Sequence, residues 1–302
     1  MRTRQQARQG LMIYFAVLIA ASAALETTII RRGGLSAPGA GPLIYALMYV
    51  PTLASIVARL IGREGFRDIS FAWGGRTGTR AALAAWLLPV AIAIPAYGIA
   101  WGTGLVAFAA PASGMLSGIT NPIVRLAALL PVALTIGTVF SALSAFGEEV
   151  GWRGYMVPRL VEGEIPQAYL LSALVWCCWH VPLILWGGYA TGTTPALSAL
   201  LFVCAILPVG LTYAKWRMAS GSVWPCVIAH ASWNVVVQGV FDPFASGANA
   251  PTWIGESGIL VVAMVWLATV VIWNKPWAGT VRSAQNTGAP SDRRESGLAM
   301  GA

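Results

Sequence analysis

Two adjacent carboxylates and an arginine interrupt an apolar part of the sequence, in FGEEVGWRG at residues 146–154. Ionisable groups are costly to bury in lipid, so their presence inside an apolar segment favours a functional role. Glu149 and Arg153 are four residues apart with the acid first, the favoured order for an ion pair on one helix. Glu148 projects about 100° away around the helix and is left free of that pair. A free carboxylate in such a site suits a general base that takes a proton from water.

The only two histidines of the chain, His180 and His230, also lie in apolar segments, LVWCCWHVPL and VWPCVIAHASWNVV. This placement favours a functional role over a simple hydrogen bond between two helices. His230 and Asn234 are four residues apart, so they project from one helical face and can address the same oxygen atom. Trp176 lies four residues before His180 and either walls the site or is an ordinary packing tryptophan.

The depths of these residues in their helices are similar. Counted from the cytoplasmic helix ends at about 1.5 Å per residue, Glu148 lies about 15 Å deep, His180 about 18 Å and His230 about 10 Å. We therefore expect three helices to bring these side chains to one cavity. On these depths, the cavity opens to the cytoplasm rather than to the outer face.

Small residues and a proline surround these motifs. Gly147, Gly151 and Gly154 are spaced four and three residues apart, which allows close approach of a neighbouring helix. Pro182 follows His180 and is expected to loosen the backbone ladder and bend that helix around the site. Glu26, near the outer end of the first apolar run, is interpreted as an interfacial residue.

The elements that position these residues are predicted to be membrane-spanning helices. The chain has 302 residues, of which 57% are hydrophobic and only 10% are charged, whereas soluble domains carry about 25% charge. Closed barrels need alternating segments of about 10 residues, so unbroken runs of about 20 favour helices. The sequence predicts an all-α, polytopic membrane helix bundle with about eight transmembrane helices, at residues 11–30, 40–61, 81–101, 131–157, 168–187, 196–213, 223–241 and 254–274.

The net charge of +8 is interpreted as membrane topology and not as nucleic-acid binding. With the N-terminus in the cytoplasm, sixteen basic residues fall inside and only Arg31, Arg32 and Arg125 fall outside. This asymmetry follows the positive-inside rule and supports an even number of spans with both termini cytoplasmic. We expect an integral protein of the cell membrane, with the lipid bilayer as one partner and no nucleic acid.

The chain is organised as one membrane domain, residues 1–275, with its core at about 131–240, and a disordered cytoplasmic tail, residues 276–302. The first apolar run contains Ala21-Ser22-Ala23, which resembles a signal-peptide cleavage site. The run continues for a full spanning length, which favours an uncleaved helix. The four cysteines lack metal-ligand spacing and are interpreted as small buried apolar side chains: Cys177, Cys178, Cys204 and Cys226.

Three motifs resemble those of the CPBP family of intramembrane proteases, which includes the type II CAAX prenyl endopeptidases and the Abi proteins. GEEVGWRGY resembles the EExxxR motif, SALVWCCWH the FxxxH motif and GSVWPCVIAHASWN the HxxxN motif, in the family's order over about residues 131–240. The usual phenylalanine of the second motif is Trp176 here, which puts the cavity shape and substrate preference in doubt. The resemblance implies a water-activating base, its supporting pair, two water- or metal-binding histidines and a ligand or oxyanion donor, at Glu148, Glu149, Arg153, His180, His230 and Asn234.

The implied reaction is hydrolysis of a peptide bond near the cytoplasmic membrane face, in a peptide or protein substrate of unknown identity. A carboxylate and two histidines, Glu148, His180 and His230, could form a three-ligand zinc site with one open position, although the HExxH spacing is absent. The alternative is a metal-free mechanism in which Glu148 and His180 share the water. The base role of Glu148 is slightly favoured, because a carboxylate bound to zinc is a poorer base.

Two other functions fit the same residues. A non-proteolytic immunity or scaffold protein could bind a partner through the same cavity. A proton-coupled transporter could relay protons through glutamate and histidine side chains, but the chain shows no internal repeat.

Overall fold

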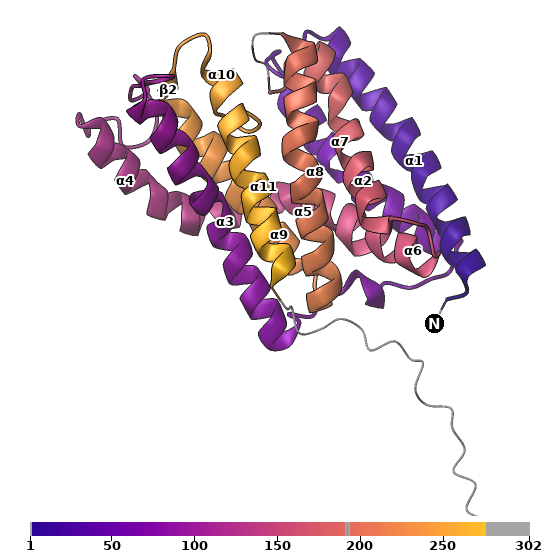
Figure 1. Ribbon diagram of the computed structural model, residues 1–302. Coiled ribbons are helices and arrows are strands. Elements are labelled where there is room, and N and C mark those ends of the chain that lie inside the picture. The colour runs from indigo at the N-terminus through magenta and orange to yellow at the C-terminus, as the bar shows by residue number, and fades with distance from the viewer. Residues whose placement is uncertain (1, 191, 193, 276–302) are drawn as a thin grey trace, which may run out of the picture.

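The computed structural model describes residues 2–190, 192 and 194–275, which form a bundle of helices with one small two-stranded sheet (Figure 1). This confirms the predicted all-α membrane fold. Within the described residues, six helices are long and apolar enough to cross a membrane, and two shorter helical segments lie among them. The predicted disordered tail, residues 276–302, lies outside the described residues.

The helices match the predicted apolar runs closely. The first three long helices are Arg4–Arg31 (α1), Ala40–Ile61 (α2) and Gly75–Gly102 (α3). The fourth is continuous over Pro122–Glu162 and consists of Pro122–Val132 (α4), Ala133–Gly137 (η2), Thr138–Gly151 (α5), Trp152–Met156 (η3) and Val157–Glu162 (α6).

The second half of the chain completes the bundle. Its long helices are Ala168–Pro182 (α7), continued by Leu183–Gly187 (η4), and Pro195–Ser220 (α8). The shorter helices are Trp224–Trp233 (α9), continued by Asn234–Phe241 (η5), and Ile259–Asn274 (α11). The connections contain Arg67–Ile69 (η1), Asp242–Phe244 (η6), Ala250–Trp253 (α10) and the paired strands Ala107–Phe108 (β1) and Ala245–Ser246 (β2).

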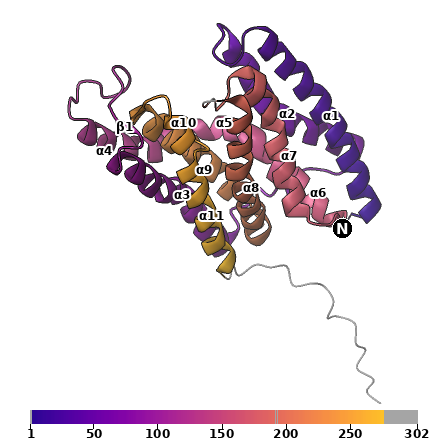
Figure 2. The ribbon, with the colours of Figure 1, turned by 45° about the horizontal axis from the view of Figure 1, so that its top comes forward.

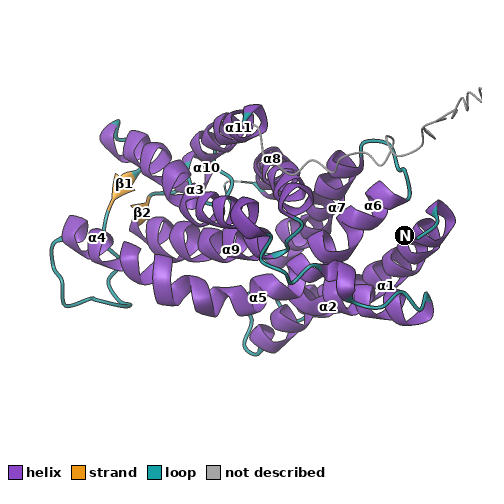
Figure 3. Cartoon of the chain, turned by 90° about the horizontal axis from the view of Figure 1, so that it is seen from below, coloured by secondary structure: helices purple, strands orange, loops and turns teal. Residues whose placement is uncertain are grey.

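The helix that carries the two adjacent carboxylates is longer than a simple span. Its 41 residues correspond to about 60 Å at 1.5 Å per residue, about twice the 30 Å of a hydrocarbon core. It accordingly crosses the bundle obliquely, with α5 near the middle (Figures 1 and 3). The helix contains two π-helical segments, η2 and η3, and such segments often occur at functional sites.

The packing of the helices brings the predicted motifs together. Helix α5 packs against α2 and α9, while α7 packs against α8 (Figure 2). The three elements that carry the predicted site residues, α5, α7 and α9, therefore belong to one core. Glu26 lies near the end of α1, as expected from the sequence, but it is buried with 7% exposure and makes no ion pair with Arg31 or Arg32 in the described part of the chain.

All four cysteines are free thiols. Cys177 and Cys226 are buried, as predicted, whereas Cys204 is half-buried and Cys178 is exposed on the outside of the bundle. The exposure of Cys178 differs from the prediction, because the sequence of an apolar helix does not show which of its faces packs against the protein.

Glycines allow α5 to approach α2, as the sequence predicted. A Cβ on Gly147 would lie 2.7 Å from the Tyr49 ring and 2.9 Å from the Met48 carbonyl oxygen. A Cβ on Gly151 would lie 2.3 Å from the carbonyl carbon of Pro51. Rotation of a side chain cannot relieve all of these contacts, because the Met48 and Pro51 atoms named here belong to the backbone.

Replacement of Gly151 by alanine should therefore destabilise the bundle by about 1–3 kcal/mol, the usual cost of overpacking. Thermal unfolding of the detergent-solubilised protein measures this loss. Gly98→Ala is the matched control, because a Cβ at Gly98 in α3 meets nothing within 4 Å. Equal melting temperatures for the two variants would show that the α2–α5 contact tolerates an added methyl group.

Arginines hold the π-helical segment η3 at the end of the bundle near the N-terminus. Arg217 Nε donates to the Arg153 carbonyl oxygen at 2.9 Å, and Arg59 Nη2 donates to the Gly154 carbonyl oxygen at 3.1 Å. A π-helix shifts its hydrogen bonds by one residue, and these guanidinium groups supply donors to its carbonyl oxygens. The position of η3, and therefore of Arg153, is thus fixed from outside the helix.

Two arginines, Arg59 and Arg159, also fix the connection between α2 and α3. Asp68 in η1 forms ion pairs with Arg59 and Arg159, the latter at 2.5 Å. Burial alone would raise the pKa of Asp68, but hydrogen bonds to the two guanidinium groups and their positive charges lower it below the usual value. Asp68 is therefore ionised at neutral pH and ties this connection to α2 and α6.

Candidate active site

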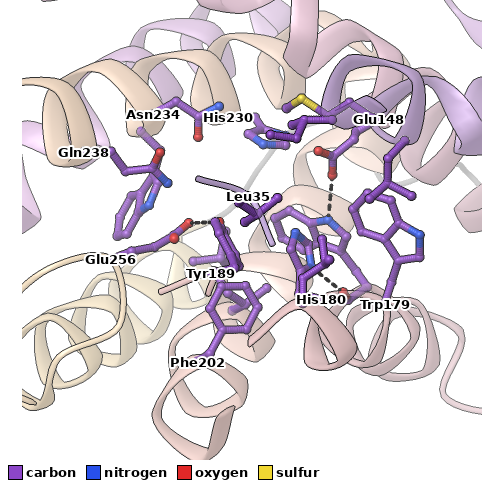
Figure 4. Close-up of a pocket in the computed structure, with 18 of the residues that line it drawn as sticks. Leu35, Glu148, Trp179, His180, Tyr189, Phe202, His230, Asn234, Gln238 and Glu256 are labelled. Carbon is purple, nitrogen blue, oxygen red and sulfur yellow. Dashed lines mark hydrogen bonds between the residues drawn. The ribbon is translucent and has the colours of Figure 1, made fainter. Parts of the chain in front are cut away.

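A cavity of about 230 Å³ lies inside the bundle and contains the predicted site residues (Figure 4). Glu148 from α5, His180 from α7, His230 from α9 and Asn234 from η5 all line it. Glu149 and Arg153 do not line the cavity but lie behind its wall, where both side chains are fully buried. The remaining lining is mostly apolar or aromatic: Leu35, Ile44, Leu47, Met48, Trp176, Trp179, Leu183, Tyr189, Phe202, Ile206, Val209, Tyr213, Trp233, Gln238 and Glu256.

The carboxylate of Glu148 is held by two indole groups. Its Oε2 accepts from Trp176 Nε1 at 3.1 Å and from Trp152 Nε1 at 3.3 Å. The sequence predicted that Glu148 would be free of Arg153, and no ion pair joins them in the described residues. Its Oε1 accepts no hydrogen bond from that part of the chain and is not among the buried atoms without a partner. One carboxylate oxygen is therefore fixed, and the other is available to the cavity.

Glu149 links Arg153 to His230. Its Oε1 accepts from Arg153 Nη1 at 2.9 Å, which confirms the predicted ion pair, and also from His230 Nδ1 at 3.0 Å. The guanidinium group of Arg153 lies 4.1 Å from the ring centroid of Trp176 and 5.0 Å from that of Tyr213. This stacking uses the aromatic faces to stabilise a cation that is removed from water. The carboxylate and guanidinium pair thus orients the His230 ring from behind the cavity wall.

The tautomer of His180 follows from its partner. His180 Nδ1 lies 2.8 Å from the Trp176 carbonyl oxygen, and because a carbonyl only accepts, Nδ1 must carry the proton. In a neutral ring this leaves Nε2 as an acceptor. The ring is packed by Trp179 and Phe202, each with its centroid 4.9 Å away. Its orientation is therefore fixed by packing as well as by the hydrogen bond.

His230 has the same arrangement with a different partner. Its Nδ1 donates to the carboxylate of Glu149, so Nε2 is the atom left for the cavity. The side-chain amide of Asn234, one helical turn further, has no hydrogen-bond partner among the described residues. Figure 4 shows His230 and Asn234 side by side along the same helix, as their spacing predicted. A ring nitrogen and an amide group are thus both available to one bound group.

The sequence analysis did not identify four residues of the site. Trp152 donates to Glu148, and Tyr189, Gln238 and Glu256 line the cavity. Gln238 continues the four-residue spacing of His230 and Asn234, and this signal could have identified it. Glu256 lies at the start of a predicted apolar run, where a carboxylate is unusual. Trp152 and Tyr189 carried no signal, because aromatic residues are frequent throughout this chain.

The cavity extends toward the end of the bundle opposite the N-terminus. The connections α1–α2, η4–α8 and α10–α11 lie at that end (Figure 1). They contain the lining residues Leu35, Tyr189 and Glu256. On the side of the N-terminus, Trp152 and Trp216 are fully buried. The opening to the cytoplasm stays a prediction, since it depends on which end of the bundle faces the cytoplasm.

The predicted zinc ligands do not form a metal site in the described residues. There, no three histidine, cysteine, aspartate or glutamate side chains are grouped closely enough to hold a metal ion. The indole ring of Trp176 contacts both histidines, with its centroid 5.8 Å from that of His180 and 5.7 Å from that of His230. Glu148 Oε2 is also already occupied by two donors. In this structure Glu148, His180 and His230 are therefore not grouped as a three-ligand zinc site requires.

The fold and cavity define a polytopic helical membrane protein with an enclosed carboxylate, imidazole and amide site. Residues 128–236 match the family model described as type II CAAX prenyl endopeptidase Rce1-like. This match includes every residue of the three motifs and confirms the resemblance to the CAAX protease family over that segment. No curated protein matches the chain.

Proposed function

We propose that this protein is an intramembrane endopeptidase that hydrolyses a peptide bond with a water molecule activated by Glu148. The observation that carries the proposal is the convergence of Glu148, His180, His230 and Asn234 on one cavity inside the bundle. The match to a protease family over the same residues supports it. The apolar lining of the cavity suits an apolar peptide segment as the substrate.

In this mechanism Glu148 and His180 hold the water. Oε1 of Glu148 takes a proton from the water while the indoles of Trp152 and Trp176 hold Oε2. His180 Nε2 accepts the second water proton in a hydrogen bond, because its Nδ1 is committed to the Trp176 carbonyl oxygen. A general base held in position contributes about 10²–10⁴ to such a rate. The remaining hydroxide oxygen attacks the substrate carbonyl carbon.

His230 and Asn234 stabilise the oxyanion that forms on the substrate carbonyl. The Asn234 amide donates one hydrogen bond, and a protonated His230 ring donates a second from Nε2. The carboxylate of Glu149, 3.0 Å from Nδ1, provides the negative charge that favours this protonated ring. When the carbon–nitrogen bond breaks, Glu148 returns its proton to the leaving amine, so the reaction consumes one water and regenerates the enzyme.

A chelator experiment tests the metal-free form of this mechanism. Purified protein in proteoliposomes should hydrolyse members of a library of internally quenched apolar peptides, with cleavage sites assigned by mass spectrometry. The rate should be unchanged by EDTA or 1,10-phenanthroline, because the proposed water is held by protein side chains alone. Inactivation by the chelator followed by recovery with zinc would replace this mechanism with a zinc-dependent one. The absence of cleavage of every peptide would count against the endopeptidase function itself.

A further inference from the structure

A second polar group of residues lies in the same cavity, away from the proposed catalytic base. It consists of Tyr189, Gln238 and Glu256, which we name the Tyr189 cluster. Tyr189 Oη donates to Glu256 Oε1 at 2.9 Å, and the Gln238 side chain interacts with both groups. Figure 4 shows Gln238 and Glu256 on the far side of His230 and Asn234 from Glu148. The cavity thus has a polar region beyond the site of hydrolysis.

The Tyr189 cluster is also the boundary of a second pocket. This pocket, of about 320 Å³, is lined by Tyr189, Gln238 and Glu256 together with residues of the connections around η6 and α10. The same three side chains therefore contact both spaces. A substrate chain that extends from the site of hydrolysis toward the end of the bundle opposite the N-terminus must pass them.

The carboxylate of Glu256 has no basic partner. None of the ion pairs formed by the described residues includes it, and its partners Tyr189 and Gln238 are neutral. Burial raises the pKa of Glu256 to about 7, as expected for a carboxylate without a cation. A carboxylate can accept about four hydrogen bonds, so Glu256 retains capacity for a further donor.

A second carboxylate without a basic partner, that of Asp242, lies close to Glu256. Asp242 in η6 lines the second pocket and accepts a hydrogen bond from the Tyr97 hydroxyl. Burial raises the pKa of Asp242 to about 6. It too forms no ion pair with any described lysine or arginine. The electrostatic environment of the Tyr189 cluster therefore favours a positively charged group.

The helix geometry gives the distance between the two polar regions. Gln238 lies eight residues after His230, which corresponds to at most about 12 Å, because an α-helix rises 1.5 Å per residue and the π-helical segment η5 rises less. An extended peptide advances about 3.3 Å per residue, so this separation spans three or four substrate residues. A side chain that reaches the Tyr189 cluster therefore belongs to a residue at that distance from the scissile bond.

We propose that the Tyr189 cluster is a substrate subsite that binds a lysine or arginine side chain located three or four residues from the scissile bond. The assignment of a scissile bond rests on the proposed endopeptidase function, whereas binding of the basic side chain does not. Glu256 supplies the charge, Gln238 an additional acceptor, and Tyr189 holds the carboxylate in place. Glu256 and Gln238 lie outside the segment that matches the family model, and Tyr189 lies within it.

Peptide binding tests the subsite without requiring turnover. A Glu148→Gln variant in nanodiscs of neutral phosphatidylcholine is titrated with fluorescein-labelled leucine and alanine peptides that carry one lysine at successive positions. A second set carries glutamine at the same positions. One lysine position should bind at least about tenfold more tightly than its glutamine counterpart, the effect of a hydrogen bond between charged groups. Glu256→Gln, added to this variant, should abolish the difference while the glutamine peptides bind as before.

The pH dependence and a matched control distinguish a binding role from a structural one. Because the pKa of Glu256 is about 7, the preference for lysine should be present above that pH and fade below it as the carboxyl becomes protonated. The titratable groups that face Glu256 are Tyr189, Asp242 and His230. Glu26→Gln is the control and should keep the preference, because Glu26 is a buried carboxylate that lines neither pocket.

Two results would overturn the proposal. Equal affinity for the lysine and glutamine peptides at every position would remove the subsite, and so would a preference that survives Glu256→Gln. Hydrolysis by the unmodified protein is measured separately. A failure of the subsite therefore shows in peptide affinity, and a failure of the endopeptidase function shows in peptide cleavage.

Discussion

Replacement of Glu148 by glutamine should reduce peptide hydrolysis by about 10²–10⁴-fold, the contribution of a positioned general base. The glutamine side chain has the same shape, and its oxygen can still accept from Trp152 and Trp176, which now donate to Oε2. It cannot, however, take a proton from water. The loss should therefore appear in kcat at constant folded protein, measured with quenched peptides in proteoliposomes and by thermal unfolding.

Glu26→Gln is the matched control for this experiment. Glu26 is also a buried carboxylate in a long apolar helix, with 7% exposure, but it does not line the catalytic cavity. Its replacement should leave kcat within about twofold of the unmodified protein. If Glu148→Gln retained a rate within tenfold, the proton would have to be taken by another group, and the role of His180 would need to be re-examined first.

The fold was predictable because lipid imposes a simple rule on the sequence. Backbone groups must be hydrogen-bonded within each span, so unbroken apolar runs become helices. The predicted run 40–61 coincides with α2, and 168–187 coincides with α7 and η4. The run 131–157 corresponds to a longer helix, Pro122–Glu162. The hydropathy of a segment indicates whether it can lie in lipid. It does not give the full length of a helix that crosses the bundle obliquely.

The site was predictable where it depended on one helix. The Glu149–Arg153 ion pair and the common face of His230 and Asn234 follow from the four-residue spacing alone. Of the two indole donors to Glu148, Trp176 was noted as a residue that could wall the site, whereas Trp152, four residues after Glu148 on the same helix, was missed. Tyr189 and Glu256 come from connections, whose positions depend on tertiary packing.

Replacement of Arg153 by alanine should have the largest effect on stability, because it leaves the fully buried Glu149 without its cation. Removal of one partner of a buried ion pair typically costs about 3–5 kcal/mol. The Arg153→Ala substitution also removes the cation that lies over the rings of Trp176 and Tyr213. We expect a strongly lowered melting temperature and increased cleavage by trypsin in detergent. Arg63→Ala, which changes an exposed arginine, should alter neither measurement.

The double variant Glu149→Gln, Arg153→Met separates the charge from the rest of the interaction. It removes both charges and keeps similar volumes, and such replacement of a buried pair is often neutral or stabilising. It should therefore recover most of the stability lost in Arg153→Ala, but not the activity, because His230 loses the carboxylate that orients its ring at 3.0 Å. Recovery of hydrolysis together with stability would show that Glu149 and Arg153 serve only the fold. Stability without hydrolysis would place the pair in the mechanism through His230.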